Sequence, residues 1–234
     1  AFAKDIMGKR VSYLKNCPGG LSSCEKPPCP IPSATTHDWL FFVGFWIGDG
    51  WTDENCKRTA ICQVKPHTRV IIEECMVNMG LEAVHNQDKY HIYDRELFNF
   101  LNPYSIGAVN KRLPQWALKL SVEDSISLMK GLIASDGTVS KQSGQASYCT
   151  SSTGLRDDVM QLALHCGLGT NYSILKPEGS ISYIKGRAII SQFISWRVAI
   201  ITSKCQPTVN HGHVHQQQRQ TERLVKHTGS VHCI

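Results

Sequence analysis

The sequence lacks any long apolar run and has few charged residues. No stretch approaches the roughly 18 consecutive apolar residues of a transmembrane helix, so we expect no membrane span, and the opening residues show no signal-peptide pattern. Charged residues make up only 19% of the chain and hydrophobic residues 41%. This balance excludes a largely disordered chain, and 234 residues suffice for one large domain or two small ones.

The net charge and the cysteine content further narrow the class of protein. The net charge of +6 leans toward polyanionic partners but does not by itself establish nucleic-acid binding. Ten cysteines are present, and several stand among apolar residues, namely Cys62, Cys75, Cys149 and Cys166. Cysteines in such positions are typical of reduced thiols in an intracellular protein. We therefore expect no disulfide framework.

Two similar segments combine small residues with a terminal acid. Segment 42–50 reads FVGFWIGDG and segment 129–137 reads MKGLIASDG, so Gly44 and Gly48 in the first match Gly131 and Ser135 in the second. Small residues four apart share one face of a helix. Two such helices can approach each other backbone to backbone.

Each segment ends in Asp-Gly, which places Asp49 and Asp136 at helix C-termini. The glycine favours a chain that leaves the helix with positive φ. The negative end of the helix dipole disfavours a carboxylate, and packing of the two helices would bring both acids together. Two carboxylates this close together repel each other unless a positive charge lies between them. The sequence therefore predicts a divalent metal site.

An internal repeat relates the two segments to the chain that follows them. Asp136 follows Asp49 by 136 − 49 = 87 positions, and Gly167 follows Gly80 by 167 − 80 = 87. The same offset pairs Cys62 with Cys149 and Gln63 with Thr150. A register that holds over such a length predicts an α+β fold built from two αββαββ halves.

Apolar periodicity, turn residues and caps predict the individual elements. The expected helices are 36–49, 70–81, 97–101, a stretch reaching 120, the helix ending at 136, and 153–166; the expected strands lie within 51–65, in a hairpin over 82–94, and at 146–151, 171–176, 181–185 and 196–202. We expect a lead-in and linker over 1–36, the first half over 37–120, the second over 121–205, and a polar linker over 206–234.

The two acidic segments resemble the paired signature helices of the LAGLIDADG homing endonucleases, in the form with both halves in one chain. The sixth motif position, an acid in the family's name, is Ile47 here and Ala134 in the second copy. That position varies in the family. The resemblance implies that Asp49 and Asp136 bind Mg²⁺, which Mn²⁺ or Ca²⁺ can replace in binding, with Gly48 and Ser135 as further ligands.

The family pattern also implies residues around the metals. Lys111 and Lys204 correspond to the basic residue that polarises the attacking water in each half. Gln63 and Thr150 correspond to the polar residue that helps to organise this water. In the family, antiparallel sheets form a saddle whose outward side chains enter the major groove. The candidate DNA contacts are Lys57, Arg58, Gln63, Lys65, Lys141, Gln142, Gln145, Tyr148, Lys176, Lys185, Arg187 and Arg197. Each alone could equally be a solvated surface residue.

The ends of the chain carry a second, shorter resemblance. Residues 229–234 (GSVHCI) resemble the start of the C-terminal splicing block of inteins, and residues 1–11 resemble the segment after the N-terminal block. No residue 1 nucleophile and no terminal His-Asn pair are present, so we expect no splicing. These ends fit the endonuclease insert of an intein.

The resemblance implies a monomeric endonuclease that cuts both strands of a long, non-palindromic double-stranded DNA target, inside the cell and in the nucleus of a eukaryote. An RNA maturase and an insert that binds DNA without cutting it stay open as alternatives. Two other metal sites also stay open, with surface or loop roles as the simpler reading of each: the cysteines Cys17, Cys24 and Cys29, and the histidines His211, His213 and His215.

Overall fold

The computed structural model describes residues 9, 11–12, 14–16, 24–184, 186–203, 205–206 and 208–209. Contacts divide the chain into one unit of residues 16–203 and another that joins residues 1–15 to 204–234. In the latter, β1 (Val11–Ser12) pairs antiparallel with β12 (Thr208–Val209). Within these described ranges, no helix has both the length and the apolar character for a membrane crossing.

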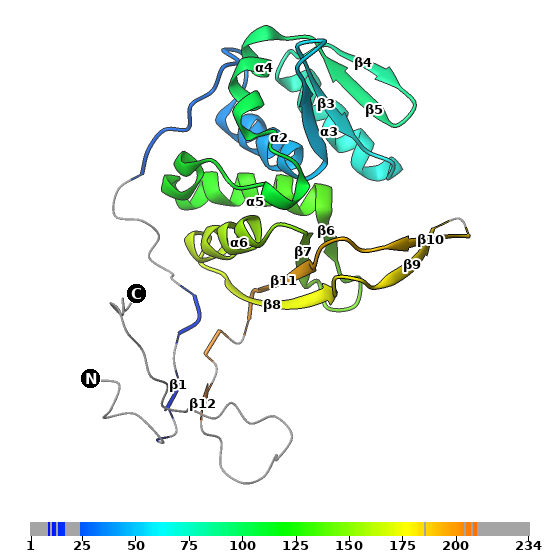
Figure 1. Cartoon of the computed structure of the whole chain (residues 1–234). Coiled ribbons are helices and arrows are strands. Elements are labelled where there is room, and N and C mark those ends of the chain that lie inside the picture. The colour runs from blue at the N-terminus through cyan, green and yellow to red at the C-terminus, as the bar shows by residue number, and fades with distance from the viewer. Residues whose placement is uncertain are drawn as a thin grey trace, which may run out of the picture. The chain divides into compact units, whose positions relative to one another are not determined.

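The unit of residues 16–203 contains two halves with the same order of elements (Figure 1). The first half consists of α2 (Thr36–Asp49), β2 (Gly50–Asp53), β3 (Arg58–Cys62), α3 (Pro66–Asn78), β4 (Ala83–Asn86) and β5 (Lys89–Ile92). The second consists of α5 (Val122–Asp136), β6 (Gly137–Val139), β7 (Ala146–Thr150), α6 (Thr153–His165), β8 (Gly169–Lys176) and β11 (Ser195–Ile201), with a hairpin of β9 (Ile181–Ile184) and β10 (Arg187–Ile190) inserted before β11.

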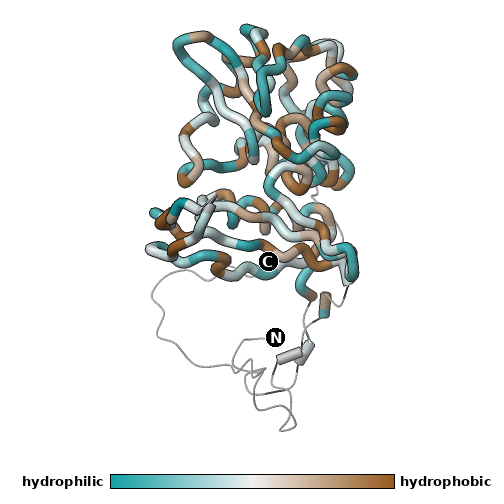
Figure 2. The backbone as a smooth tube through the Cα atoms, turned by 90° about the vertical axis from the view of Figure 1, so that its right-hand side faces the viewer, coloured by the Kyte–Doolittle hydropathy of each residue, from teal (hydrophilic) through white to brown (hydrophobic). Residues whose placement is uncertain are grey.

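Each half folds its strands into one antiparallel sheet of four. The orders are β2-β3-β5-β4 and β6-β7-β11-β8, so matching strands occupy matching places. Apolar and polar segments interleave along both halves in Figure 2. The predicted α+β fold with two αββαββ halves is confirmed.

Several boundaries differ from the sequence prediction. Helix α3 begins at Pro66 and not at Val70, because proline at the first helical position has no amide hydrogen that needs a partner. The stretch before Leu120 is a 3₁₀ helix, Gln115–Lys119, and not an α-helix. Strand β6, which follows Asp136 directly, and strand β10 were not predicted. Both are short, so alternation over so few residues gives a weak signal.

Helices α2 and α5 pack with their backbones in contact. A methyl group built on Gly131 would lie 2.0 Å from the carbonyl oxygen of Phe41, and one built on Gly44 would lie 2.2 Å from that of Leu128. Leu128 follows Phe41 by 128 − 41 = 87 positions, so the two contacts are the same contact related by the repeat. The predicted stripe of small residues is therefore the interface between the halves.

The glycines that follow the two acids do not have the positive φ that we predicted. Gly50 has φ −108° and Gly137 has φ −92°, both extended, because a strand begins at once. Glycine is needed there for space. A methyl group on Gly50 would lie 2.5 Å from the carbonyl oxygen of Trp46, and one on Gly137 would lie 2.3 Å from that of Ile133.

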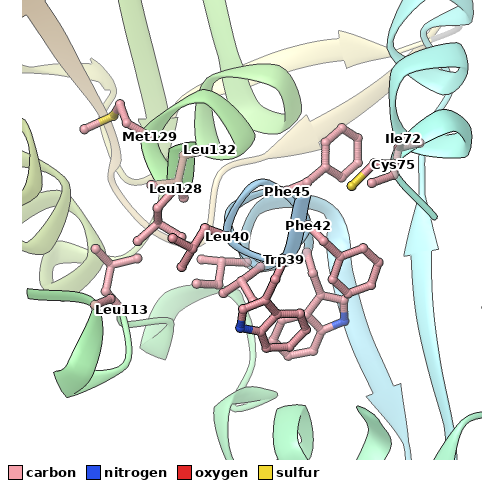
Figure 3. Close-up of a cluster of buried hydrophobic side chains, with 14 of the residues drawn as sticks. Trp39, Leu40, Phe42, Phe45, Ile72, Cys75, Leu113, Leu128, Met129 and Leu132 are labelled. Atoms are coloured by element: carbon pink, nitrogen blue, oxygen red, sulfur yellow. The ribbon is translucent and has the colours of Figure 1, made fainter. Parts of the chain in front are cut away.

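The apolar core is continuous across the helix pair but richer in aromatic side chains in the first half (Figure 3). The fully buried side chains of α2 include Trp39, Phe42 and Phe45, whereas those of α5 include Leu128 and Leu132.

A short helix, α4 (Arg95–Leu101), covers this core in the first half, and the described residues that follow β11 form no helix equivalent to it. After α4, the chain runs through the 3₁₀ turns Asn102–Tyr104 and Ala108–Asn110 to the second half.

Candidate active site

The two aspartates that end α2 and α5 interact with each other. Burial, and then the charge of Asp136, raise the pKa of Asp49 to about 6. Asp136 keeps a solvent-exposed edge, yet loss of water around its carboxyl group raises its pKa as well. Both groups also stand at the negative ends of helix dipoles. The pair is therefore poorly stabilised by the protein alone, which is the condition expected of a cation site.

Two lysines bring positive charge to this pair. The Lys111 ammonium group donates a hydrogen bond of 2.6 Å to the carbonyl oxygen of Gly48, and that of Lys65 donates one of 2.9 Å to the carbonyl oxygen of Ser135. Gly48 and Ser135 are related by the repeat, since 135 − 48 = 87, and each precedes an acid. One ammonium group thus lies beside the end of each signature helix.

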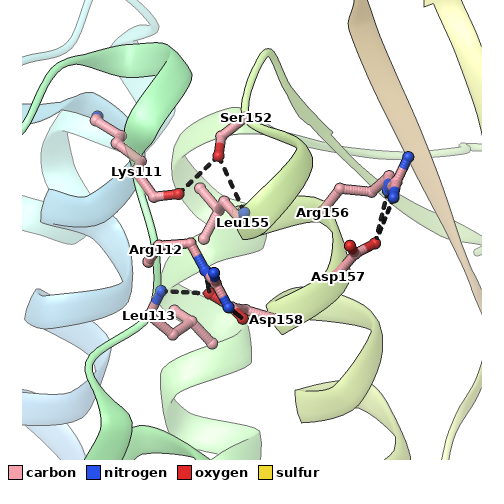
Figure 4. A network of polar contacts seen from close by, with 8 residues as sticks. All are labelled: Lys111, Arg112, Leu113, Ser152, Leu155, Arg156, Asp157 and Asp158. Carbon is pink, nitrogen blue, oxygen red and sulfur yellow. Dashed lines mark hydrogen bonds and ion pairs between the residues drawn. The ribbon is translucent and has the colours of Figure 1, made fainter.

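Lys111 is held in place by the second half of the chain (Figure 4). Its own carbonyl oxygen accepts a hydrogen bond from the Ser152 hydroxyl, 2.7 Å away. The next residue, Arg112, forms a two-pronged ion pair with the buried Asp158 of α6, at 2.6 and 2.7 Å, and Asp158 also accepts the Leu113 amide hydrogen. Burial lowers the pKa of Lys111, although the two aspartate charges oppose this change. A lysine with a lowered pKa can exchange a proton more readily near neutral pH.

Lys65 lies beside the acid pair, a position that the sequence prediction, which assigned it to DNA contact, did not give it. It comes from the first half but reaches the carbonyl before the acid of the second half. Its repeat equivalent is Ser152, since 152 − 65 = 87, so the repeat gave no signal for a second lysine there. Lys204, the residue predicted for this role, lies outside the described residues.

Gln63 orients one of the acids. Its side-chain nitrogen donates to an oxygen of Asp49 at 2.8 Å, and its side-chain oxygen accepts the amide hydrogen of Lys65 at 2.9 Å. Gln63 is buried, so the DNA contact predicted for its side chain is wrong. Its position beside Asp49 is compatible with its other predicted role, which is to help organise the attacking water. Its repeat equivalent, Thr150, accepts the amide hydrogen of Ser152 at the start of α6.

Tyr148 is also not a DNA contact, because its side chain is fully buried. Burial, and then the charges of Asp136 and Asp49, raise its pKa well above the usual value, so its hydroxyl group lies within electrostatic reach of both acids. That hydroxyl is buried without a hydrogen-bond partner among the described residues. The repeat predicts this burial, since 148 − 61 = 87 pairs Tyr148 with the buried Ile61.

The other predicted DNA contacts are distributed over the surface. Exposed side chains are those of Lys57, Lys65, Lys141, Gln142, Gln145, Lys176, Arg187 and Arg197. Arg58 is half-buried in an ion pair of 2.9 Å with Asp53. Lys185 lies outside the described residues. Arg197 alternates with the buried Val198, so it lies on the outer face of its sheet, away from the helices.

The donors at the site suit a hard divalent cation. Two carboxylates stand at the ends of the helices, each next to a backbone carbonyl oxygen that accepts a hydrogen bond from a lysine ammonium group, and oxygen is the ligand that Mg²⁺ and Ca²⁺ prefer. In the described part of the chain, this pair included, no group of three or more His, Cys, Asp or Glu side chains is placed to hold a metal. Cys24 and Cys29 are free thiols there, while Cys17, His211, His213 and His215 fall outside the described residues.

Part of the second half of the chain is similar to a known sequence family. Residues 124–209 match the LAGLIDADG-like domain. The matched LAGLIDADG-like region begins within α5 and so includes Asp136, Tyr148 and the strands of the second sheet.

Three curated proteins are similar over most of the chain. They are an RNA polymerase subunit beta C-terminal section from Stigeoclonium helveticum, 30% identical over 99% of this chain, an ATP-dependent Clp protease proteolytic subunit from Chlamydomonas moewusii, 29% identical over 85%, and a SufBD family iron–sulfur cluster assembly protein from Mycobacterium leprae, 30% identical over 73%. The chain spans only 26%, 22% and 20% of their respective lengths.

Several solved structures are also similar. The homing endonuclease I-DmoI, in a complex with DNA and Mn, has 12% identity and a TM-score of 0.44, over 70% of this chain and 89% of that one. I-DmoI has also been solved with Mg and with Ca. The N-terminal LAGLIDADG domain of DUF199/WhiA has 12% identity and a TM-score of 0.43, over 74% and 79%.

Proposed function

We propose that this protein is a site-specific DNA endonuclease that uses divalent metal to cut both strands of its target. The observation that carries the proposal is the arrangement at the ends of α2 and α5. Two aspartates whose pKa values are raised by burial stand there, Asp49 also by the charge of Asp136, with an ammonium group on the carbonyl before each one. Simple structural helices have no need for this concentration of opposed charge at their ends.

Asp49 and Asp136 would hold the metal, and the carbonyl oxygens of Gly48 and Ser135 could join them once the two lysine ammonium groups had moved away. Mg²⁺ bound there would relieve the charge on the reacting phosphate and on the departing oxygen. The residues of the chain supply the rest. Gln63 fixes the orientation of Asp49 through its 2.8 Å hydrogen bond. Lys111, whose pKa is lowered by burial, would exchange a proton, and Lys111 and Lys65 would both bring positive charge close to the reacting phosphates.

The repeat explains how one chain could cut two strands. Each half contributes one acid, and the contacts of Gly44 and Gly131 place the repeat axis between α2 and α5. Two phosphates on opposite strands of a duplex can then meet equivalent sites. The halves differ in their strands and loops, so the target is expected to be non-palindromic and the protein to act as a monomer. Exposed basic residues such as Arg187 and Arg197 would contact the backbone or base edges.

The curated relatives support an inserted element. An RNA polymerase subunit, a protease subunit and an iron–sulfur assembly protein have no common activity, yet the same chain matches each of them over about a quarter of its length or less. An intein inserted into each host would explain this pattern. The target would then be a gene of the host that lacks the insert, and the protein would act inside the cell.

Selection of cleaved sites from a randomised pool of double-stranded DNA, with Mg²⁺ and with EDTA, tests the proposal. We expect one long asymmetric site to be enriched only with Mg²⁺. Asp49→Asn and Asp136→Asn should each abolish double-strand cleavage and retain binding, whereas Glu178→Gln, an exposed acid in the turn before β9, should cut normally. Binding without any cleavage would indicate an inactive insert. Preference for structured RNA over DNA would indicate a maturase.

A further inference from the structure

A cavity of about 670 Å³ lies between α3 of the first half and the second half. Its volume falls within the roughly 300–1,000 Å³ that is usual for ligand sites. Apolar side chains line most of it, among them Ile71 of α3, Ile126 and Met129 of α5, and Ile200 of β11. Ile200 is buried on the face of the sheet that packs on the helices, so the cavity is separate from the outer face that carries Arg197.

The repeat shows what covers the equivalent surface in the first half. Subtracting 87 from Ile126, Val139 and Lys141, which line the cavity, gives Trp39, Thr52 and Glu54. All three of those residues contact the segment that contains α4. The Trp39 ring packs edge-on against Phe100 at 5.4 Å, the Thr52 hydroxyl bonds to the Asn102 side chain at 2.7 Å, and Glu54 also accepts a hydrogen bond from Asn102.

The repeat also relates the opposite wall of the cavity to residues that are covered elsewhere in the structure. Adding 87 to Lys65, His67 and Ile71 of that wall gives Ser152, Gly154 and Asp158. These three contact the residues that follow α4: the Ser152 hydroxyl bonds to the carbonyl of Lys111, a methyl group on Gly154 would lie 2.2 Å from the Arg112 side chain, and Asp158 pairs with Arg112.

The cavity therefore stands where a second copy of the segment 95–113 would lie. After β11, the described residues 202–203 and 205–206 form no helix, and Thr202 lines the cavity edge. In the first half, the corresponding helix α4 inserts Leu97, Phe98 and Leu101, all of them buried.

The charged side chains that line the cavity are all basic, whereas the equivalent of Lys141 in the first half is the acid Glu54. Lys65, His67, Lys130 and Lys141 line it, and no Asp or Glu does. We propose that this cavity is the docking site of a short helix from another polypeptide, one that carries aliphatic and aromatic side chains on one face and acidic residues beside them. This inference does not depend on DNA cleavage. Helix-in-groove recognition of this kind uses apolar anchors at helical spacing, and the basic rim would favour an acidic helix.

A labelled peptide with the sequence of residues 94–104, DRELFNFLNPY, is the probe, because it contains two acids and the apolar side chains of α4. Fluorescence anisotropy with the full chain should show saturable binding. The same peptide with Leu97→Ser, Phe98→Ser and Leu101→Ser should bind at least tenfold more weakly. In the protein, Ile71→Glu should weaken binding at least tenfold, while Val77→Glu, at a more exposed position of α3 outside the cavity, should leave it unchanged.

Ile126→Glu gives a second, independent change in the cavity wall, and unfolding midpoints identify any variant that has lost its fold. Lys130→Glu with Lys141→Glu should weaken binding about threefold or more. No saturation up to about 1 mM peptide would overturn the proposal, as would equal effects of Ile71→Glu and Val77→Glu. Self-association of the chain that Ile71→Glu abolishes would assign the cavity to a second copy, and uptake of an apolar dye without the peptide would assign it to a small molecule. Either result would also overturn the proposal.

Discussion

Replacing Asp49 with asparagine should stabilise the metal-free protein. Burial and the charge of Asp136 raise the pKa of Asp49 from 3.8 to about 6, so its carboxylate is less stable in the folded chain than in the unfolded chain. At pH 8, this difference corresponds to up to about 3 kcal/mol of unfolding free energy. Asparagine carries no charge, and its side-chain oxygen can still accept the hydrogen bond from Gln63. The variant should therefore gain stability as it loses cleavage.

The sign of the pKa change determines how the stability of the native protein depends on pH. Below 3.8, Asp49 is protonated in both states, and the native protein and the variant should have equal stability. Between 3.8 and about 6, the folded native protein holds more protons than the unfolded chain, so its stability falls as the pH rises. The gap between the two proteins should open over this interval and stay constant above it.

Thermal unfolding in EDTA and in Mg²⁺ provides the assay. In EDTA at pH 8, the Asp49→Asn variant should unfold at a higher temperature, by up to about 6–12 °C for a chain of this size, and the difference should vanish near pH 3.8. Mg²⁺ should raise the Tm of the native protein and not that of the variant. Glu178→Gln serves as the control. If the variant in EDTA at pH 8 were no more stable than the native protein, the electrostatic reasoning about this pair would be refuted.

Three further changes test other contacts. Gly131→Ala should lower the free energy of unfolding by about 1–3 kcal/mol in urea, because its methyl group would lie 2.0 Å from a carbonyl oxygen of α2; equal stability of Gly131→Ala and the exposed neighbour Lys130→Ala would contradict backbone contact. Lys111→Met should slow single-turnover cleavage about 10²–10⁴-fold with DNA affinity unchanged, and an unaltered rate would exclude it from the chemistry. Arg112→Ala should cost about 1–3 kcal/mol in the same urea titration, because Asp158, 4% exposed, loses its charged partner; no change would show the pair to be neutral.

Much of the fold could be predicted because two signals in the sequence agree. The spacing of Gly44 and Gly48 predicts a helix interface, and the offset of 87 transfers that prediction to Gly131 and Ser135. Backbone contact then follows from geometry alone, since only small residues permit it. The offset of 87 likewise relates Asp49 to Asp136, so both acids could be predicted to stand at helix ends.

The prediction was incomplete where a side chain acts across the interface or where the repeat breaks. Lys65 bonds to the opposite half, and no local pattern records such a contact. The prediction for Tyr148 relied on its place on a strand and not on its repeat partner Ile61, so its inward orientation was missed. Gly50 was predicted to leave the helix with positive φ, although crowding by Trp46 is what requires glycine there. Strand β10 has no counterpart in the first half, so the repeat could not reveal it.

The anchoring of Lys111 has a consequence for the timing of assembly during synthesis. The first half leaves the ribosome earlier and includes Asp49, Gln63 and Lys111. The backbone around Lys111, however, is gripped by Ser152 and Asp158, which are made about 40 residues later. A nascent chain that has completed only its first half thus has the parts of a reactive centre without the grip that aligns them. If the proposed DNA cleavage takes place, it would begin only once both halves have been made.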